Sequence, residues 1–224
     1  MALNAYENVM ERVRAAAERA GRDPSEITVV AVSKEHPVEA IRELYDAGHR
    51  DFGENRAQDL AEKAAALPSD IRWHFIGALQ TNKARLVRPV ARLLHSMDRD
   101  RLADAWIKGV GLPPPVLVQV NLAAEPQKAG AAPEEVEGLV VYCEGLGIEV
   151  RGLMIIPPVS DEPEDSRRWF RGLREMAERI RDHHPAATEL SMGMTDDFEV
   201  AIEEGATMIR VGRAIFGPRQ MTGA

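Results

Sequence analysis

The stretch ITVVAVSKEH, residues 27–36, does most to decide the predicted fold. Its first six residues form an almost continuous apolar run rich in Val and Ile, which is typical of a parallel strand covered on both faces. The residues that follow are Ser33, Lys34, Glu35 and His36. An open doubly wound sheet needs a glycine-rich phosphate loop at this point, so the stretch favours a closed barrel instead.

Seven further apolar runs follow the first along the chain. They are RDFG (50–53), IRWHFIG (71–77), RLLHSM (92–97), PVLVQVN (115–121), VRGLMII (150–156), ATELSM (187–192) and ATMIRVG (206–212). Helical patterns lie between these runs. Eight strands that alternate with helices predict an α/β protein, a (β/α)8 TIM barrel that forms a single domain over residues 1–224.

The predicted helices have recognisable starts. Pro37 suits the first position of one helix, and a second is expected directly after Pro133. Asp196 and Asp197 are expected to open a third, since acidic side chains favour the positive end of a helix. The longest is expected from about residue 164 to 181, with one buried face of Trp169, Phe170, Leu173, Met176 and Ile180. The first 21 residues, MALNAYENVMERVRAAAERAG, add an extra amphipathic helix before the first strand.

Composition excludes several classes of function. The chain has 45% hydrophobic and 29% charged residues, which is typical of a globular protein, and its formal net charge of −8 argues against a nucleic-acid partner. No apolar stretch has the length of a signal peptide core or a membrane span, so we predict a cytoplasmic protein without a membrane partner. The single cysteine, Cys143, predicts a buried structural thiol, and no histidine pair has metal-binding spacing, so no metal site is expected.

Lysine is scarce in this chain. Of 28 basic residues only five are lysine, namely Lys34, Lys63, Lys83, Lys108 and Lys128. A lysine that persists where arginine is preferred can be needed as an amine, because a guanidinium cannot form a Schiff base. For any single lysine, chance retention is the better explanation, so position in the fold has to decide.

The predicted barrel mouth combines Lys34 with two candidate anion-binding loops. In such barrels the active site lies at the carboxyl ends of the strands, and phosphate often binds after strands seven and eight. Here these segments read SMGMT (191–195) and RVGR (210–213), in which Gly193 and Gly212 let backbone N–H groups approach an anion. Ser191 and Arg213 could add a hydroxyl and a charge. Simple turns are the alternative explanation for either glycine alone.

Lys34 ends the first predicted strand, so its amine should point over the same mouth. In apolar surroundings such an amine becomes a nucleophile toward a carbonyl group. A solvated lysine is the plainer alternative, and these features fit an aldolase as well as a pyridoxal phosphate protein. Other mouth candidates follow strands two and three, namely Glu54, Asn55 and the cluster His74, Gln80, Asn82 and Lys83, although a lone histidine in a strand is usually a core group. Gln119, Asn121 and Lys128 complete the polar residues near the mouth.

The ordered motifs resemble a known family. They are AVSK, FGENRAQD, WHFIGALQTNK, HSMD, QVN followed by Lys128 and Gly130, GLM, SMGMTDDFEVAI and RVGRAIFG. From about residue 28 to 219 the chain is similar to the pyridoxal phosphate homeostasis proteins, whose fold is that of the N-terminal barrel of alanine racemase. Ala57, Asp59 and Thr195 depart from the residues expected of that family, which puts a contact from position 59 in doubt.

The resemblance implies a fold-type III pyridoxal 5'-phosphate (PLP) site. By this similarity Lys34 carries PLP as a Schiff base, and Arg210 lies beside the pyridine nitrogen. Asn55 lies near the ring, and Lys128 is a further candidate lysine. The phosphate is expected to contact Ser191, Met192, Gly193, Gly212 and Arg213.

The resemblance also implies a carrier or buffer of PLP rather than an enzyme, with apo-forms of PLP enzymes as candidate recipients and a monomeric state. The alternative is a PLP-dependent amino-acid racemase. A two-base racemase needs an acid/base group on each face of its substrate. Little sequence follows the eighth predicted strand, so we expect no second domain to supply one. The tyrosines Tyr6, Tyr45 and Tyr142 are all predicted on helices, away from the mouth.

Overall fold

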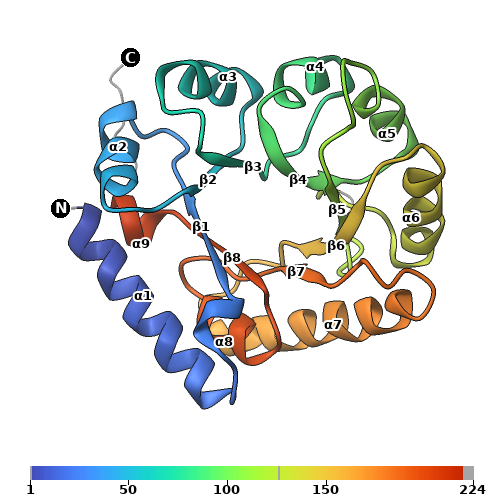
Figure 1. Ribbon diagram of the computed structural model, residues 1–224. Coiled ribbons are helices and arrows are strands. Elements are labelled where there is room, and N and C mark those ends of the chain that lie inside the picture. Colours follow the sequence, from blue (N-terminus) through green and yellow to red (C-terminus); the bar gives the residue numbers. More distant parts are fainter. Residues whose placement is uncertain (1, 126, 219–224) are drawn as a thin grey trace.

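The computed structural model describes residues 2–125 and 127–218, and these form a closed barrel of eight parallel strands in sequential order (Figure 1). The eight predicted strands are all confirmed, with ends that agree or differ by no more than two residues. The barrel closes where β1 pairs with β8, with Val30 opposite Arg210. The strands are β1 (Thr28–Val32), β2 (Asp51–Glu54), β3 (Arg72–Phe75), β4 (Ala91–Met97), β5 (Val116–Val120), β6 (Val150–Ile155), β7 (Glu189–Ser191) and β8 (Met208–Val211).

The strands are apolar on both faces because each face is covered. Every residue of β5 is buried, as are the last four of β1. Side chains that point outward pack against the helices in one large core. Inside the barrel, a smaller separate cluster is formed by Leu93, Leu117, Met154 and Met208. The polar side chains described below therefore lie within an otherwise packed interior.

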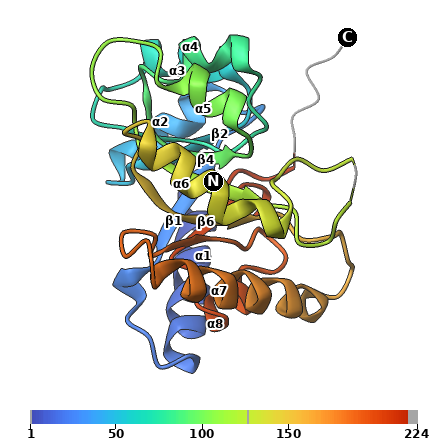
Figure 2. The same ribbon diagram turned by 90° about the vertical axis from the view of Figure 1, so that its right-hand side faces the viewer.

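Helices surround the barrel, and Figure 2 shows α6 and α7 crossing its outside next to β6. The helices are α1 (Ala2–Arg19), α2 (Val38–Asp46), α3 (Ala57–Ala66), α4 (Ala84–Val87), α5 (Asp100–Trp106), α6 (Val136–Gly145), α7 (Arg167–Arg181), α8 (Phe198–Glu203) and α9 (Arg213–Phe216). Among the described residues no helix is both long and apolar enough to cross a membrane.

The predicted helix starts are close to those observed. Pro37 lies one residue before α2, and Pro133 opens a short 3-10 turn that leads into α6. Asp197 precedes α8 and accepts a hydrogen bond from the Met194 N–H at 2.7 Å. On α7 the predicted apolar face is buried except for Trp169, which is half-buried.

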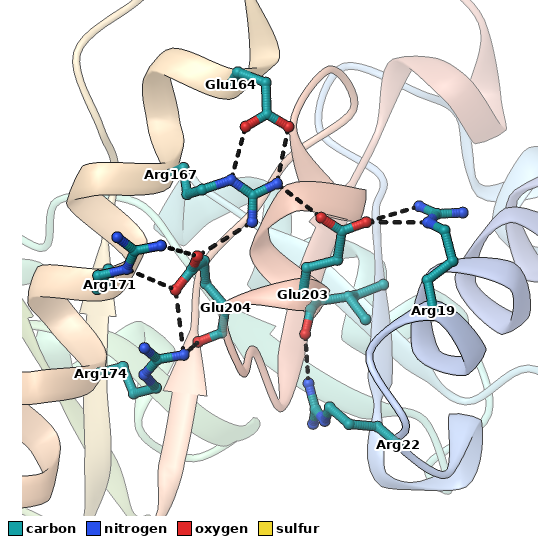
Figure 3. A network of polar contacts seen from close by, with 9 residues as sticks. Arg19, Arg22, Glu164, Arg167, Arg171, Arg174, Glu203 and Glu204 are labelled. Carbon is teal, nitrogen blue, oxygen red and sulfur yellow. Dashed lines mark hydrogen bonds and ion pairs between the residues drawn. The ribbon is translucent and has the colours of Figure 1, made fainter.

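The extra helix α1 covers the outside of the barrel beside the β1–β8 seam, where it packs against α8, α9 and α2. Its apolar stripe of Val9, Val13, Ala16 and Ala17 is buried. Figure 3 shows an ion network that continues this contact. Glu203 on α8 pairs with Arg19 of α1 at 3.0 Å and Arg167 of α7 at 2.8 Å. The next residue, Glu204, is nearly buried and pairs with three arginines of α7, namely Arg167, Arg171 and Arg174.

Candidate functional site

A cavity of about 580 Å³ opens at the carboxyl ends of the strands, where the sequence predicted the site. Its walls come from the ends of β1, β2, β3, β5 and β8 and from the loops that follow them. Five of the predicted site residues line this cavity: Lys34, Asn55, Arg210, Gly212 and Arg213. The predicted neighbours Gln119, Asn121 and Lys128 line it as well.

Lys34 lies two residues after the end of β1 and is half-buried at the cavity wall. Among the described residues, none forms a hydrogen bond or ion pair with its amine. Lys128 differs, because its amine pairs with Glu125 at 2.5 Å and donates to the Pro157 carbonyl at 3.1 Å. Lys34 is therefore the lysine whose amine is available to a ligand in the cavity.

A buried ion pair fixes the chain immediately before Lys34. The Ser33 hydroxyl donates to Glu54 Oε1 at 2.8 Å, and Lys63 Nζ donates to the Ser33 carbonyl at 2.8 Å and to the same Glu54 oxygen at 2.5 Å. Sequence reasoning placed the Glu54 carboxylate at the mouth, but it is buried beneath the cavity wall instead. Its partner Lys63 lies on α3, nine residues further along the chain, and no sequence signal identified this contact.

The loops after β7 and β8 form one side of the cavity. Met194, Thr195 and Asp196 line it together with Gly212 and Arg213. The backbone N–H groups of Thr195 and Arg213 donate to no acceptor in the described part of the chain, so they can receive an anion. A side chain at Gly212 would place its Cβ 3.2 Å from the Val32 carbonyl oxygen, so the close approach of β1 to this loop requires glycine. The Arg213 guanidinium is exposed and pairs with Asp196 at 2.5 Å.

Three predicted phosphate contacts lie behind the cavity wall rather than on it. Ser191 and Met192 are completely buried, and neither they nor Gly193 line the cavity. Gly193 has φ +90°, and a Cβ there would lie 2.5 Å from the Ala201 Cβ. The close packing of α8 therefore explains why position 193 is a glycine. The residue of this segment that carries a hydroxyl and lines the cavity is Thr195.

Arg210 reaches the cavity from inside the barrel. It donates from Nη1 to Ser191 Oγ at 2.6 Å and from Nη2 to the Ile155 carbonyl at 2.8 Å. Complete burial lowers the pKa of Arg210 to about 10, although the charge of Asp197 opposes the shift. The guanidinium remains a cation at neutral pH, and it is held by neutral acceptors in these two contacts.

His36 is a cavity residue that sequence reasoning did not select. It is buried, lines the cavity and stacks on Phe216 with ring centroids 5.1 Å apart. Burial lowers the pKa of His36, and the charge of Lys63 lowers it further. Its position two residues after Lys34 was the available signal. His74 is a core group as predicted, since it is buried and bonded to Asp51 and His95.

The arrangement has a definite chemical capacity. Among the described residues the Lys34 amine has no partner and two loops carry unpaired backbone N–H groups, and the residues that bear these groups line one cavity together with the buried Arg210. Among the described residues no cluster of His, Cys, Asp or Glu could hold a metal ion. The fold and this site define a closed parallel barrel with a lysine at its mouth, a class of protein whose site can hold an anionic ligand that carries a carbonyl group.

Comparison with known proteins agrees with this class of barrel. The alanine racemase N-terminal domain model matches residues 5–220. The chain is 44% identical to the pyridoxal phosphate homeostasis protein of Aquifex aeolicus, over 95% of this chain and 96% of that one, and 41% identical to that of Escherichia coli K12, with 94% of each covered. It therefore belongs to the pyridoxal phosphate homeostasis proteins of the alanine racemase N-terminal domain family, as its motifs predicted.

Solved structures show the same fold. A protein of unknown function from Bifidobacterium adolescentis superposes with a TM-score of 0.90 at 34% identity, over 96% of this chain and 94% of that one. PipY of Synechococcus elongatus PCC7942, in its structure with PLP bound, superposes with a TM-score of 0.79 at 37% identity, over 93% of this chain and 100% of that one. Alanine racemase from Corynebacterium glutamicum superposes with a TM-score of 0.71 at 18% identity, with 62% of its length covered. At this identity the likeness shows the fold alone.

Proposed function

We propose that this protein binds PLP as a Schiff base on Lys34 and serves as a carrier or buffer of the cofactor without catalysing a reaction of its own. The observation that carries the proposal is that the unpartnered Lys34 amine faces the same cavity as the two N–H-bearing loops and Arg210. A cavity of about 580 Å³ is also within the usual range for small cofactors. The homologue PipY, which has been solved with PLP, supports the choice of ligand.

Each part of the cavity has a role toward this ligand. Lys34 would hold the aldehyde carbon of PLP through its amine, with one water molecule released on condensation. The Thr195 hydroxyl and the N–H groups of Thr195 and Arg213 donate to the phosphate, with Gly212 allowing the close approach. We retain Arg213 as a phosphate contact and Asn55 as a contact near the ring. Ser191, Met192 and Gly193 support this side of the cavity from behind, so Thr195 replaces Ser191 as the proposed hydroxyl donor.

Arg210 argues against catalysis. Arginine has donors only, so a hydrogen bond from Arg210 to the ring nitrogen requires that nitrogen to be an unprotonated acceptor. PLP supplies an electron sink for carbanions when it is bound to an enzyme, and a protonated ring nitrogen strengthens that sink. Arg210 would therefore weaken it.

The alternative racemase function requires a second acid/base group in the cavity. The three tyrosines lie on α1, α2 and α6, and none of them lines it. Their hydroxyls are bonded elsewhere, with Tyr6 paired to His49, Tyr45 to Asp70 and Tyr142 to Asp104. We propose a monomeric cytoplasmic protein whose recipients are apo-forms of PLP enzymes.

The test is spectroscopic. Wild-type protein mixed with PLP should become yellow, and borohydride should fix the ligand covalently on Lys34, where mass spectrometry of peptides can locate it. Lys34→Ala should remove the visible band without loss of the fold, because a half-buried residue at the rim contributes little packing. Lys128→Ala, in the same cavity, should keep the band.

A band that persists in Lys34→Ala and vanishes in Lys128→Ala would show that the attachment site is wrong. A protein that stays colourless with PLP would instead favour an aldolase-like lysine. Steady racemisation of alanine, serine or glutamate, measured by chiral chromatography and absent in Lys34→Ala, would favour the racemase.

A further inference from the structure

A continuous hydrogen-bond network runs through the inside of the barrel and ends on Arg210. We call Asp51, His74, His95, Ser191 and Arg210 the interior network. His74 Nε2 lies 3.1 Å from Asp51 Oδ1, and His74 Nδ1 lies 2.9 Å from His95 Nε2. His95 Nδ1 lies 2.8 Å from Ser191 Oγ, which Arg210 contacts at 2.6 Å. These residues come from β2, β3, β4, β7 and β8.

The interior network connects the two ends of the barrel. Asp51 is the first residue of β2 and lies at the end of the barrel remote from the cavity. There Arg72, the first residue of β3, forms a bidentate salt bridge with it, donating from Nε to Oδ1 at 2.7 Å and from Nη2 to Oδ2 at 2.5 Å. His95 and Ser191 are completely buried in between. At the carboxyl end Arg210 lines the cavity. A packed apolar interior tolerates such groups only when each donor and acceptor is matched.

The chemistry of the two ends fixes the direction of every hydrogen bond. Arg210 can only donate, so Ser191 Oγ accepts from it and offers its own proton to His95 Nδ1. The proton of a neutral His95 then lies on Nε2 and is donated to His74 Nδ1. His74 in turn donates from Nε2 to the Asp51 carboxylate. With both imidazoles neutral, this arrangement pairs every group in the interior network.

The charges around the network favour the same state. Burial opposes ionisation of Asp51, but hydrogen bonds from Arg72 and His74 outweigh it and hold the pKa of Asp51 well below its ordinary range. Complete burial lowers the pKa of His95 strongly, and the positive charge of Arg210 acts in the same direction. Asp51 therefore stays an acceptor, and His95 stays neutral.

We propose that Ser191, His95 and His74 are positioning residues that hold Arg210 as a fixed donor at the cavity wall, and that they thereby keep the ring nitrogen of a bound pyridoxal ligand unprotonated. This inference rests on the function proposed above and deepens it. It also gives Ser191 a different role from the phosphate contact that the sequence suggested. Without the Ser191 oxygen, Arg210 keeps one acceptor, the Ile155 carbonyl, and loses the contact that sets its rotation.

Two ligands separate this role from a general loss of binding. PLP carries the ring nitrogen, whereas its 1-deaza analogue has a C–H group at that position and keeps the aldehyde and phosphate. In wild-type protein PLP should bind tighter than the analogue by about tenfold to a hundredfold, as expected for a hydrogen bond to a charged group. Ser191→Ala should remove most of this preference, and His74→Gln should reduce it from a site that does not touch Arg210.

Thr195→Val is the matched control, because it removes a hydroxyl from the phosphate side of the cavity. It should weaken both ligands by the same factor and leave their ratio unchanged. A preference for PLP that survives in Ser191→Ala would overturn the inference. Failure of the proposed function looks different, since then neither ligand would give a band that depends on Lys34. Circular dichroism of each variant checks that its fold is intact.

A second measurement needs no ligand. Nitrogen-15 NMR of the histidine rings in the apo-protein should show His95 and His74 as neutral imidazoles with the proton on Nε2 at neutral pH. Ser191→Ala should change the Nδ1 signal of His95, which then loses its donor. A proton on Nδ1 of His95, or a protonated His95 ring, would contradict the direction assigned to the interior network.

Discussion

Replacing Lys63 with methionine tests the buried ion pair that precedes the proposed ligand lysine. The Glu54 side chain has 0% exposure and the Lys63 side chain 11%. One carboxylate oxygen of Glu54 receives both Lys63, at 2.5 Å, and the Ser33 hydroxyl, at 2.8 Å. The other oxygen, Oε2, is buried and has no hydrogen-bond partner among the described residues. Lys63 is therefore the cation that compensates this carboxylate.

Lys63→Met keeps most of the side-chain volume and removes the charge. It leaves the Glu54 carboxylate buried with one neutral donor, and breaking a buried pair in this way costs about 3–5 kcal/mol. That is a large fraction of the ~5–15 kcal/mol by which a typical domain is stable. The double variant Lys63→Met/Glu54→Gln carries no buried charge at this site, so it should recover most of the loss.

Urea unfolding of the apo-proteins, followed by circular dichroism, measures both effects. Lys108→Met, at an exposed lysine, is the control and should change the free energy of unfolding by no more than about 0.5 kcal/mol. A loss below about 1 kcal/mol in Lys63→Met, or a double variant as unstable as the single one, would refute the assignment of Lys63 as the compensating charge.

Two further predictions concern stability. Because burial lowers the pKa of His95 below its ordinary value of 6.5, the unfolded chain takes up a proton below that pH that the folded protein does not. The free energy of unfolding should thus fall with decreasing pH below 6.5, by up to about 1.4 kcal/mol per unit from this group, and urea titrations of His95→Gln should show a smaller slope. Gly152→Ala should destabilise the protein strongly, since its Cβ would lie 1.9 Å from the Glu189 carbonyl oxygen. Gly138→Ala, at an exposed position of α6, should instead raise the free energy of unfolding by about 0.5–1 kcal/mol. Melting temperatures equal to that of the wild-type protein would contradict both expectations.

The barrel could be predicted from sequence because its strands are covered on both faces. Each then reads as a short apolar run, and the position of Lys34 at the end of the first run located the mouth. The absence of a glycine-rich loop after that run excluded the open-sheet alternative. These signals are local, so one sequence was enough to find them.

The polar contacts behind the cavity were harder to predict because they join distant segments. Ser191 and Thr195 are hydroxyls four residues apart, and either could follow a strand and face an anion. Only the register of β7 shows that Ser191 points into the barrel, toward His95, which is 96 residues away in sequence. His74 was identified as a core group, but its partners Asp51 and His95 could not be identified without the closed barrel.

The attachment of α1 constrains the order in which the protein can fold. Arg12 and Glu199 are 187 residues apart, Arg19 and Glu203 are 184 apart, and Arg22 reaches the Ile202 carbonyl across 180. Contacts of this separation carry a large loop-closure entropy and form late. During synthesis α1 is made long before its partner helix α8. The buried stripe of α1 can therefore contact α2 early, but it lacks most of its docking surface until α8 and α9 have been translated, so the full attachment of α1 to the barrel comes late.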